Sequence, residues 1–177
     1  MQPAIQLRPF ARPDFLRLIS WVNSPQMLIQ WAGPTQFTFP LSLEQLEHYL
    51  QGSEGPTPIR RIFASLDGAG NVIGHIELGA LDYANQTGTL CRVLVAPQLR
   101  GEGFSVPMVQ EALRFGFEEL QLRRIDLRVY SFNTAAIRCY QRAGFVQEGV
   151  LRKALKVGNE FWDTVLMAVL KLPQSEL

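Results

Sequence analysis

The sequence predicts one mixed α/β domain in which strands and helices alternate through the centre of the chain. Its 177 residues are enough for a single domain with a sizeable core, and 47% of them are hydrophobic. From Thr89 to Phe145 the pattern indicates a strand, a glycine loop, a helix, a second strand and a second helix. Because no repeat, low-complexity segment or linker interrupts the chain, we expect residues 1–177 to form one domain.

The first fifty residues predict one short strand, two helices and a long loop. Ile5 to Arg8 alternates apolar and polar residues, as a strand does. A helix is expected after Pro13, because apolar residues recur at helical spacing from there to Val22. The stretch from Asn23 to Pro40 has three prolines and no clean period, which predicts a long loop. A second helix should follow the capping pair that begins at Ser42.

Strands account for most of the remaining chain outside the centre. A hairpin is predicted from Arg60 to Leu78, with its turn at Asp67 to Asn71. The tail indicates two further strands, around Val146 to Leu155 and around Phe161 to Leu170. Together with the central segment, these elements favour a sheet with helices packed on it.

The segment from Val93 to Leu113, VLVAPQLRGEGFSVPMVQEAL, carries most of the functional information. An apolar strand ends at Ala96, a short loop carries Gly101 and Gly103, and a helical pattern follows. Glycines let the backbone turn tightly and approach a ligand. The N–H groups and dipole of a helix N-terminus favour an anion, and Arg100 adds positive charge. The segment therefore predicts a phosphate-binding loop.

Three kinds of phosphate loop can be compared with this segment. A Walker A loop needs a Lys followed by Ser or Thr, which is missing here. A dinucleotide fingerprint needs a third glycine where this chain has Val106, and the acidic Asp126 falls mid-strand instead of at the strand end. The third pattern, QxxGxG, is formed by Gln98, Gly101 and Gly103. An ordinary glycine turn between a strand and a helix is the simplest alternative to it.

A second motif follows the loop. After the strand from Arg124 to Tyr130 come Asn133, Ala136, Tyr140 and the pair Gly144-Phe145. With the QxxGxG loop, this order resembles the GCN5-related N-acetyltransferase (GNAT) superfamily. The two ends of the chain resemble the branch that contains the ribosomal-protein N-terminal alanine and serine acetyltransferases and relatives that modify drugs and polyamines. That branch often has Ser where this chain has Ala136, a departure that weakens the argument for a ribosomal-protein substrate.

The resemblance implies a fold and an activity. The fold is a mixed, mostly antiparallel sheet with helices on both faces and a central strand pair that splays near Val95. The activity is acetyl transfer from acetyl-CoA to a primary amine, on a protein N-terminus or a small molecule, by direct attack without an acyl-enzyme. A CoA-binding module without catalysis, acting as a sensor or interaction protein, is the alternative. Dimers are a habit of the family, so a homodimer is also considered.

The resemblance also assigns residues to acetyl-CoA. The backbone from Leu99 to Ser105 would hold the pyrophosphate through N–H groups. The strand edge would align the pantetheine arm, and an N–H near Val93 would bind the oxyanion. Asn133 would bond the pantetheine or cap the helix after it. The expected cofactor-binding residues are Val93, Leu94, Val95, Gln98, Leu99, Arg100, Gly101, Glu102, Gly103, Phe104, Ser105, Asn133 and Tyr140.

Two residues are expected to move protons. Tyr140 matches the family's position for the acid that protonates the leaving thiolate, and a role in core packing is its alternative. Glu77 is the candidate base, because a buried carboxylate can have a raised pKa and accept a proton through water. A solvated strand face is the alternative for Glu77. Asp82 and Glu160 are further possibilities for the base, whereas lone histidines such as His75 and His48 are more often structural or exposed.

Composition argues against several other classes of protein. The formal net charge is +1, from 17 basic and 16 acidic residues, which gives no reason to expect binding to nucleic acid or a membrane surface. No window approaches 18 apolar residues and the start lacks a signal-peptide core, so a cytoplasmic protein is expected. Cys91 and Cys139 form no metal-binding cluster, so no metal is expected and both are interpreted as packing residues. The stretch from Asn23 to Pro40 should line the acceptor side.

Overall fold

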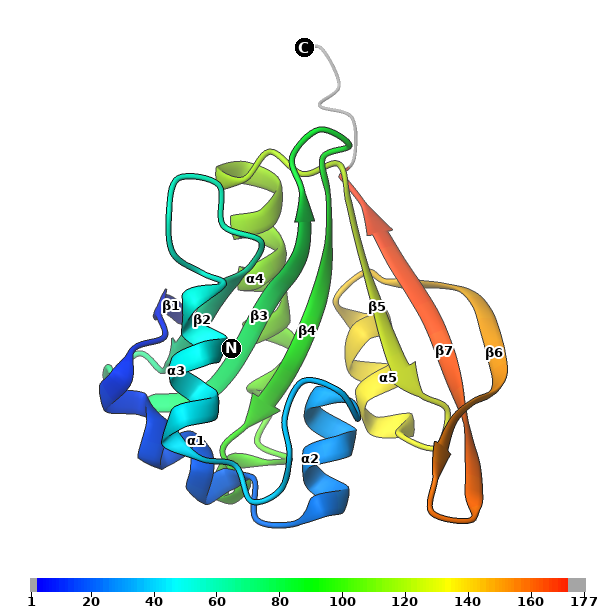
Figure 1. Cartoon of the computed structure of the whole chain (residues 1–177). Helices are drawn as coiled ribbons and strands as arrows, with labels where there is room; N and C mark the ends of the chain where they lie inside the picture. The colour runs from blue at the N-terminus through cyan, green and yellow to red at the C-terminus, as the bar shows by residue number, and fades with distance from the viewer. Residues whose placement is uncertain (1–2, 172–177) are drawn as a thin grey trace.

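A computed structural model describes residues 3–171, and its framework is a seven-stranded sheet covered by helices (Figure 1). The strand order is β1-β2-β3-β4-β5-β7-β6. The strands are β1 (Gln6–Pro9), β2 (Arg61–Leu66), β3 (Val72–Asp82), β4 (Thr87–Val95), β5 (Arg124–Tyr130), β6 (Val146–Val157) and β7 (Glu160–Leu170). Only β4 and β5 pair in parallel; every other neighbouring pair is antiparallel. The predicted mixed, mostly antiparallel sheet is confirmed.

The helices lie on both faces of this sheet. They are α1 (Phe15–Trp21), α2 (Pro25–Ala32), α3 (Leu43–Gln51), α4 (Ser105–Arg114) and α5 (Thr134–Arg142), with short 3-10 turns at Arg12–Asp14 and Pro97–Leu99 and a π turn at Phe115–Glu119. One hydrophobic core lies between the sheet and α4 and includes Ile76, Leu78, Met108, Val109, Ile125 and Met167. The other lies between the sheet and the N-terminal helices and includes Phe15, Leu18, Trp31, Leu46, Tyr49 and Leu94.

The stretch from Asn23 to Pro40 is a helix followed by a loop, so the prediction of one long loop was wrong. The side chain of Ser24 accepts a hydrogen bond from the Met27 amide at 3.1 Å and caps α2. Pro25 sits in the first turn, where its missing N–H costs little. The prolines therefore flank this helix instead of breaking it, and burial of Trp31 holds it against the sheet.

The central strand pair splays, as expected from the resemblance. β4 and β5 pair only through the three residues that end at Thr89 and Asp126, and Figure 1 shows the two strands diverging beyond that point. A bulge accompanies the divergence, because Arg92 and Val93 both lie opposite Ile76 in the register with β3. Arg92 has a left-handed φ of 50°. Since bulges bend and twist a strand, this one turns the second half of β4 away from β5.

Gly74 of β3 allows α4 to pack closely on the sheet. A Cβ at this position would lie 2.6 Å from Met108 Sδ and 2.9 Å from the carbonyl oxygen of Leu94. The end of the Met108 side chain can move away from an added Cβ, but the Leu94 carbonyl group belongs to the backbone and cannot. We expect Gly74→Ala to lower the free energy of unfolding by about 1–3 kcal/mol, the usual cost of overpacking, in urea denaturation. Gly68→Ala is the control, since the nearest atom to its Cβ is Ala4 Cβ at 3.9 Å. Equal unfolding midpoints for the two variants would contradict this account.

Candidate active site

Two cavities adjoin where β4 leaves β5. One, of about 390 Å³, lies along the splayed strands and is called the strand cavity; its walls include Gln30–Pro34, Thr89–Val93, Arg128–Tyr130 and part of β6. The other, of about 530 Å³, lies between the end of β4, the glycine loop and α5, and is called the loop cavity. Both volumes are in the range of small-molecule sites. The residues that line both cavities are Gln30, Trp31, Val93, Asn133, Ala136 and Tyr140.

The loop cavity brings together most of the residues that the sequence assigned to the cofactor. Its lining includes Val93, Leu94, Val95, Leu99, Arg100, Gly101, Gly103, Phe104, Ser105, Asn133 and Tyr140. Gln98 and Glu102, also assigned to the cofactor, are not part of this lining. Arg142 of α5 lines the cavity and was missed, because a lone Arg near a helix end carries no sequence signal of its own.

The glycine loop has the features of an anion site. Gly101 and Gly103 both have a φ of 87°, and in residues 3–171, apart from each glycine and its two chain neighbours, no atom lies within 4 Å of where their Cβ atoms would be. In residues 3–171, the amides of Gly101, Gly103 and Phe104 have no hydrogen-bond acceptor, and α4 begins directly after them. The charged residues of the lining are Arg100 and Arg142, with no Asp or Glu. These groups fit the phosphates of a CoA molecule.

Tyr140 stands at the junction of the two cavities. The side chain of Asn133 caps α5 by accepting a hydrogen bond from the Ala136 amide at 3.2 Å, which fixes the start of the helix that carries Tyr140. The hydroxyls of the other three tyrosines are hydrogen-bonded, whereas that of Tyr140 has no partner in the described part of the chain. Burial, and then the neighbouring thiols, raise the pKa of Tyr140 above its usual value of 10.0. At neutral pH it is a protonated phenol able to donate.

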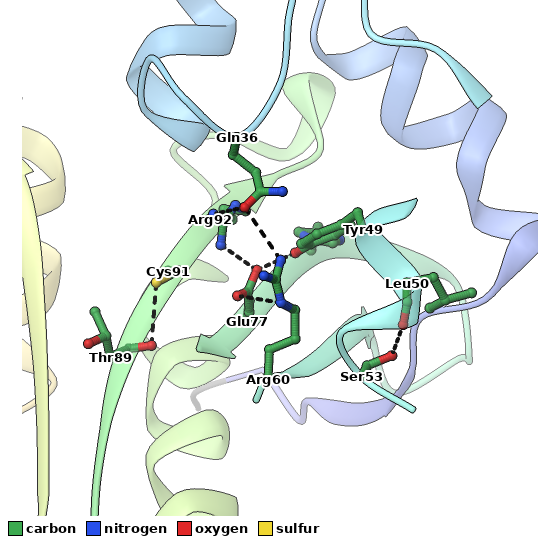
Figure 2. Close-up of polar contacts among 10 residues, drawn as sticks. Gln36, Tyr49, Leu50, Ser53, Arg60, Glu77, Thr89, Cys91 and Arg92 are labelled. Atoms are coloured by element: carbon green, nitrogen blue, oxygen red, sulfur yellow. Dashed lines mark hydrogen bonds and ion pairs between the residues drawn. The ribbon is translucent and has the colours of Figure 1, made fainter. Parts of the chain in front are cut away.

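Glu77 lies in a buried cluster of polar side chains (Figure 2). Its carboxylate is 2.6 Å from Arg92 Nη1 and 4.0 Å from Arg60 Nε, and it accepts a hydrogen bond from the hydroxyl of Tyr49. Both arginines also contact the side-chain oxygen of Gln36. Glu77 is only 1% exposed and lines neither cavity, whereas Arg92 lines the strand cavity. Glu77 as the base stays a prediction; the structure places it in an ion-pair cluster.

Burial and neighbouring charges together determine which side chains of this cluster are charged. Burial and then the charge of Glu77 raise the pKa of Tyr49 well above 10.0, so Tyr49 is neutral and donates. Burial, the largest single effect, lowers the pKa of Arg92, but the charge and hydrogen bond of Glu77 together with the neighbouring Tyr49 and Cys91 outweigh it, and the pKa is raised. Burial, and then the charge of Arg92, lower the pKa of His75 to about 3, so His75 is neutral and a poor proton acceptor. Two guanidinium groups thus share one carboxylate.

The remaining candidate bases and both cysteines show no reactive arrangement. His48, Asp82 and Glu160 line neither cavity; Asp82 instead accepts hydrogen bonds from Asn85, and Glu160 one from Trp162. Cys91 lines the strand cavity and Cys139 the loop cavity. Burial, and then the charge of Glu77, raise the pKa of Cys91 to about 12, and burial also raises that of Cys139. Both are therefore thiols at neutral pH, which argues against an acyl-enzyme.

The segment after Asn23 contributes one wall of the strand cavity. Gln30 to Pro34, at the end of α2 and just beyond it, line that wall. Trp31 donates a hydrogen bond from Nε1 to the carbonyl oxygen of Arg92 at 2.9 Å and stacks on Phe37 with ring centroids 5.5 Å apart. The helix is therefore attached directly to the bulge of β4.

Residues 3–171 contain neither a membrane-spanning helix nor a cluster of metal ligands. None of the helices in this range is long and apolar enough to cross a membrane. Within the same range, no group of three or more His, Cys, Asp and Glu side chains is placed to hold a metal ion.

Comparison with known proteins places these features in context. Residues 26–145 match the model of the acetyltransferase (GNAT) family. An uncharacterized N-acetyltransferase from the SPbeta prophage of Bacillus subtilis is 31% identical over 127 residues, covering 72% of this chain and 70% of the relative. The spermidine N(1)-acetyltransferase of Vibrio cholerae is 27% identical over 173 residues, covering 97% of this chain and 95% of the relative.

A solved structure agrees with these sequence matches. The spermidine N-acetyltransferase of Vibrio cholerae, crystallised with CoA and spermine, superposes with a TM-score of 0.82 at 26% identity. The superposition covers 94% of this chain and 95% of that one. The resemblance suggested by the QxxGxG loop and the second motif is thereby confirmed, and so is the expected fold.

Proposed function

This chain belongs to the GNAT acetyltransferase family, and on that premise we propose that it acetylates a small-molecule primary amine by direct attack, with Tyr140 as the general acid. The observation that carries the proposal is the junction of the two cavities at Tyr140. The loop cavity has the amides and arginines suited to CoA phosphates, and the adjoining strand cavity leaves space for an acceptor. A free phenol hydroxyl stands between them.

Each part of the site has a task in this reaction. Acetyl-CoA, when bound, supplies the acetyl group as a thioester. Within the loop from Leu99 to Ser105, the free amides of Gly101, Gly103 and Phe104 hold the phosphate end, together with the side chains of Arg100 and Arg142. Val93, which lines both cavities beside the bulge, offers its N–H to the developing oxyanion. The open edge of β4 aligns the pantetheine arm.

The proposed reaction needs only one proton donor from the enzyme. The neutral amine nitrogen forms a bond to the carbonyl carbon, the carbon–sulfur bond breaks, and the hydroxyl of Tyr140 protonates the departing sulfur. The proton that the amine loses then restores Tyr140 through water. Since the described walls of the strand cavity hold no Asp or Glu, deprotonation of the amine before attack would be left to water. The contacts of Glu77 support a positioning role for it, in which it holds Arg92 and the bulge.

The identity of the acceptor is the finer part of the proposal. The relatives named as spermidine N-acetyltransferases support a small amine in preference to a protein N-terminus. The strand cavity, of about 390 Å³, is of a size for such a molecule. The homodimer suggested by family habit stays a prediction.

Steady-state release of CoA thiol tests the proposed function. The protein is incubated with acetyl-CoA and a panel of primary amines and peptides, and we expect thiol release that depends on a small amine, with the acetylated amine identified by mass spectrometry. Binding of acetyl-CoA without turnover of any amine or peptide would instead favour the CoA-binding module. Turnover of peptides alone would move the acceptor to protein N-termini.

A further inference from the structure

The strand cavity carries positive charge on its walls. Its charged lining residues are Arg92 and Arg128, and the part of it formed by residues 3–171 includes no Asp, Glu, Lys or His. A polyamine in this cavity would meet two charges of its own sign and no carboxylate. The wall chemistry therefore differs from what a polycationic acceptor requires.

Arg128 is available to bind a ligand. It lies on β5, and in residues 3–171 no carboxylate oxygen is within 4.0 Å of its guanidinium group. Asp126, two residues away on the same strand face, already accepts a hydrogen bond from Thr89 Oγ1 at 2.8 Å and lies 3.9 Å from Arg124 Nε. The side chain of Arg128 is exposed, so it is not held in place by the core.

Arg92 brings an excess positive charge to the same cavity. It and Arg60 share the single carboxylate of Glu77, while Tyr49 and His75 are neutral, so the cluster has one net positive charge. The side chains of Arg60 and Arg92 are only 17% and 13% exposed, where charges interact more strongly than in water. The buried Nε of Arg92 has no hydrogen-bond partner in the described structure. A bound anion would compensate this charge.

The phosphates of CoA do not account for these two arginines. Arg100 and Arg142 line the loop cavity, beside the free amides of the glycine loop. Arg92 and Arg128 line the strand cavity and are not part of the loop cavity. The anion suited to them therefore belongs to the acceptor.

We propose that the acceptor is a small primary amine that also carries an anionic group, such as the carboxylate of an amino acid, and that Arg128 and Arg92 bind this group. This rests on the proposed function, since it names the substrate class of the same site. The anionic group pairs with the guanidinium of Arg128 at the cavity wall, and the amine faces the junction at Tyr140. Arg–carboxylate pairing with two parallel hydrogen bonds also orients the amine.

A matched series of amines tests the inference by thiol release. The compounds are 4-aminobutanoate, 1-aminobutane and 1,4-diaminobutane, which share four carbons and differ in the charge at the far end; alanine and alaninamide form a second pair. We expect kcat/KM for each anionic amine to exceed that of its cationic or neutral match by about tenfold or more at low salt, and the ratio to shrink as salt screens it. A cationic or neutral amine used equally well or better would overturn the inference and leave the proposed function standing. No turnover of any amine would overturn both.

Variants of Arg128 separate its charge from the rest of the site. Arg128→Gln should lower the preference for 4-aminobutanoate over 1,4-diaminobutane by about tenfold, and Arg128→Glu should reverse it. Arg123→Gln is the matched control, because Arg123 is exposed and lines neither cavity. Urea unfolding of each variant verifies the fold. An unchanged preference in folded Arg128→Glu would contradict the assignment of Arg128.

Discussion

Replacing Tyr140 with Phe should lower kcat by about 10²- to 10⁴-fold, the usual contribution of a general acid, and leave KM for acetyl-CoA nearly unchanged. The phenyl ring keeps the packing of Tyr140 against Phe145, whose ring centroid lies 5.8 Å away, so the wall of the loop cavity is preserved. The substitution removes only the hydroxyl group, which we propose protonates the departing sulfur. Steady-state kinetics with a turned-over amine measure both constants, and CoA affinity can be checked separately by calorimetry.

The pH dependence follows from the raised pKa of Tyr140. Tyr140 donates only when protonated, so its contribution is present below that raised pKa and is lost as pH rises through it. The amine, in contrast, attacks only when neutral, and its pKa is about 10.4. We therefore expect the wild-type rate to rise with pH from 7 to 9, with no descending limb below about pH 10. A descending limb at pH 8 that disappears in Tyr140→Phe would contradict the raised pKa.

A tyrosine outside the site provides the matched control. Tyr83 donates a hydrogen bond to the carbonyl oxygen of Pro58 at 2.9 Å and lines neither cavity. Tyr83→Phe should retain wild-type kcat. If Tyr140→Phe also retained more than about a third of wild-type kcat, far above the loss expected for an acid, Tyr140 would be a packing residue.

Replacing Glu77 with Ala should lower the free energy of unfolding by about 3–5 kcal/mol, because two buried guanidinium groups lose the one carboxylate that pairs with them in residues 3–171. The effect is large because the side chains of Glu77 and of both arginines are mostly buried. Urea denaturation with an unchanged m-value measures it. Glu119→Ala, at an exposed position that forms no ion pair with any other described residue, should stay within about 0.5 kcal/mol of wild type.

Two further variants test what Glu77 does. Because replacing both partners of a buried pair with apolar groups is often nearly neutral, Glu77→Met combined with Arg92→Met should be more stable than the sum of the single changes predicts. Folded Glu77→Gln separates the two roles in catalysis. If Glu77 positions Arg92, Glu77→Gln should change KM for the amine and keep the shape of the pH–rate profile. A loss of kcat of about 10²-fold or more, with loss of the acidic limb, would make Glu77 the base.

Local signals were sufficient for the elements of the central segment. The strand from Arg124 to Tyr130 was predicted with its observed bounds, because alternation and flanking turns act within a few residues. The helix ended by Gly144 was also predicted, and this glycine has a φ of 107°. The helix after Ser24 was not predicted. The three prolines of this stretch indicated a loop, although Ser24 followed by Pro25 is also a typical start of a helix.

The acceptor side of the site could not be predicted in this way. The cluster is built from separate elements: Glu77 lies on β3, Arg92 on β4, Tyr49 on α3, and Arg60 just before β2. Its contacts therefore depend on pairing between strands and on a helix packed over them. A single sequence shows the types of these residues and nothing of their distances. Glu77 could therefore be identified as a buried carboxylate candidate, while its pairing with two arginines could not.

The sequence by itself determined the resemblance to the GNAT acetyltransferases, and it predicts a phosphate-binding glycine loop. Both follow from the spacing of residues in two continuous stretches, the loop and the helix that carries Asn133 and Tyr140. Only the tertiary structure decided which side chains form the strand cavity on the acceptor side. The bulge at Arg92 separates β4 from β5, and the opened strand cavity is walled by side chains from distant parts of the chain. The charge of that cavity depends on which buried charges meet in three dimensions.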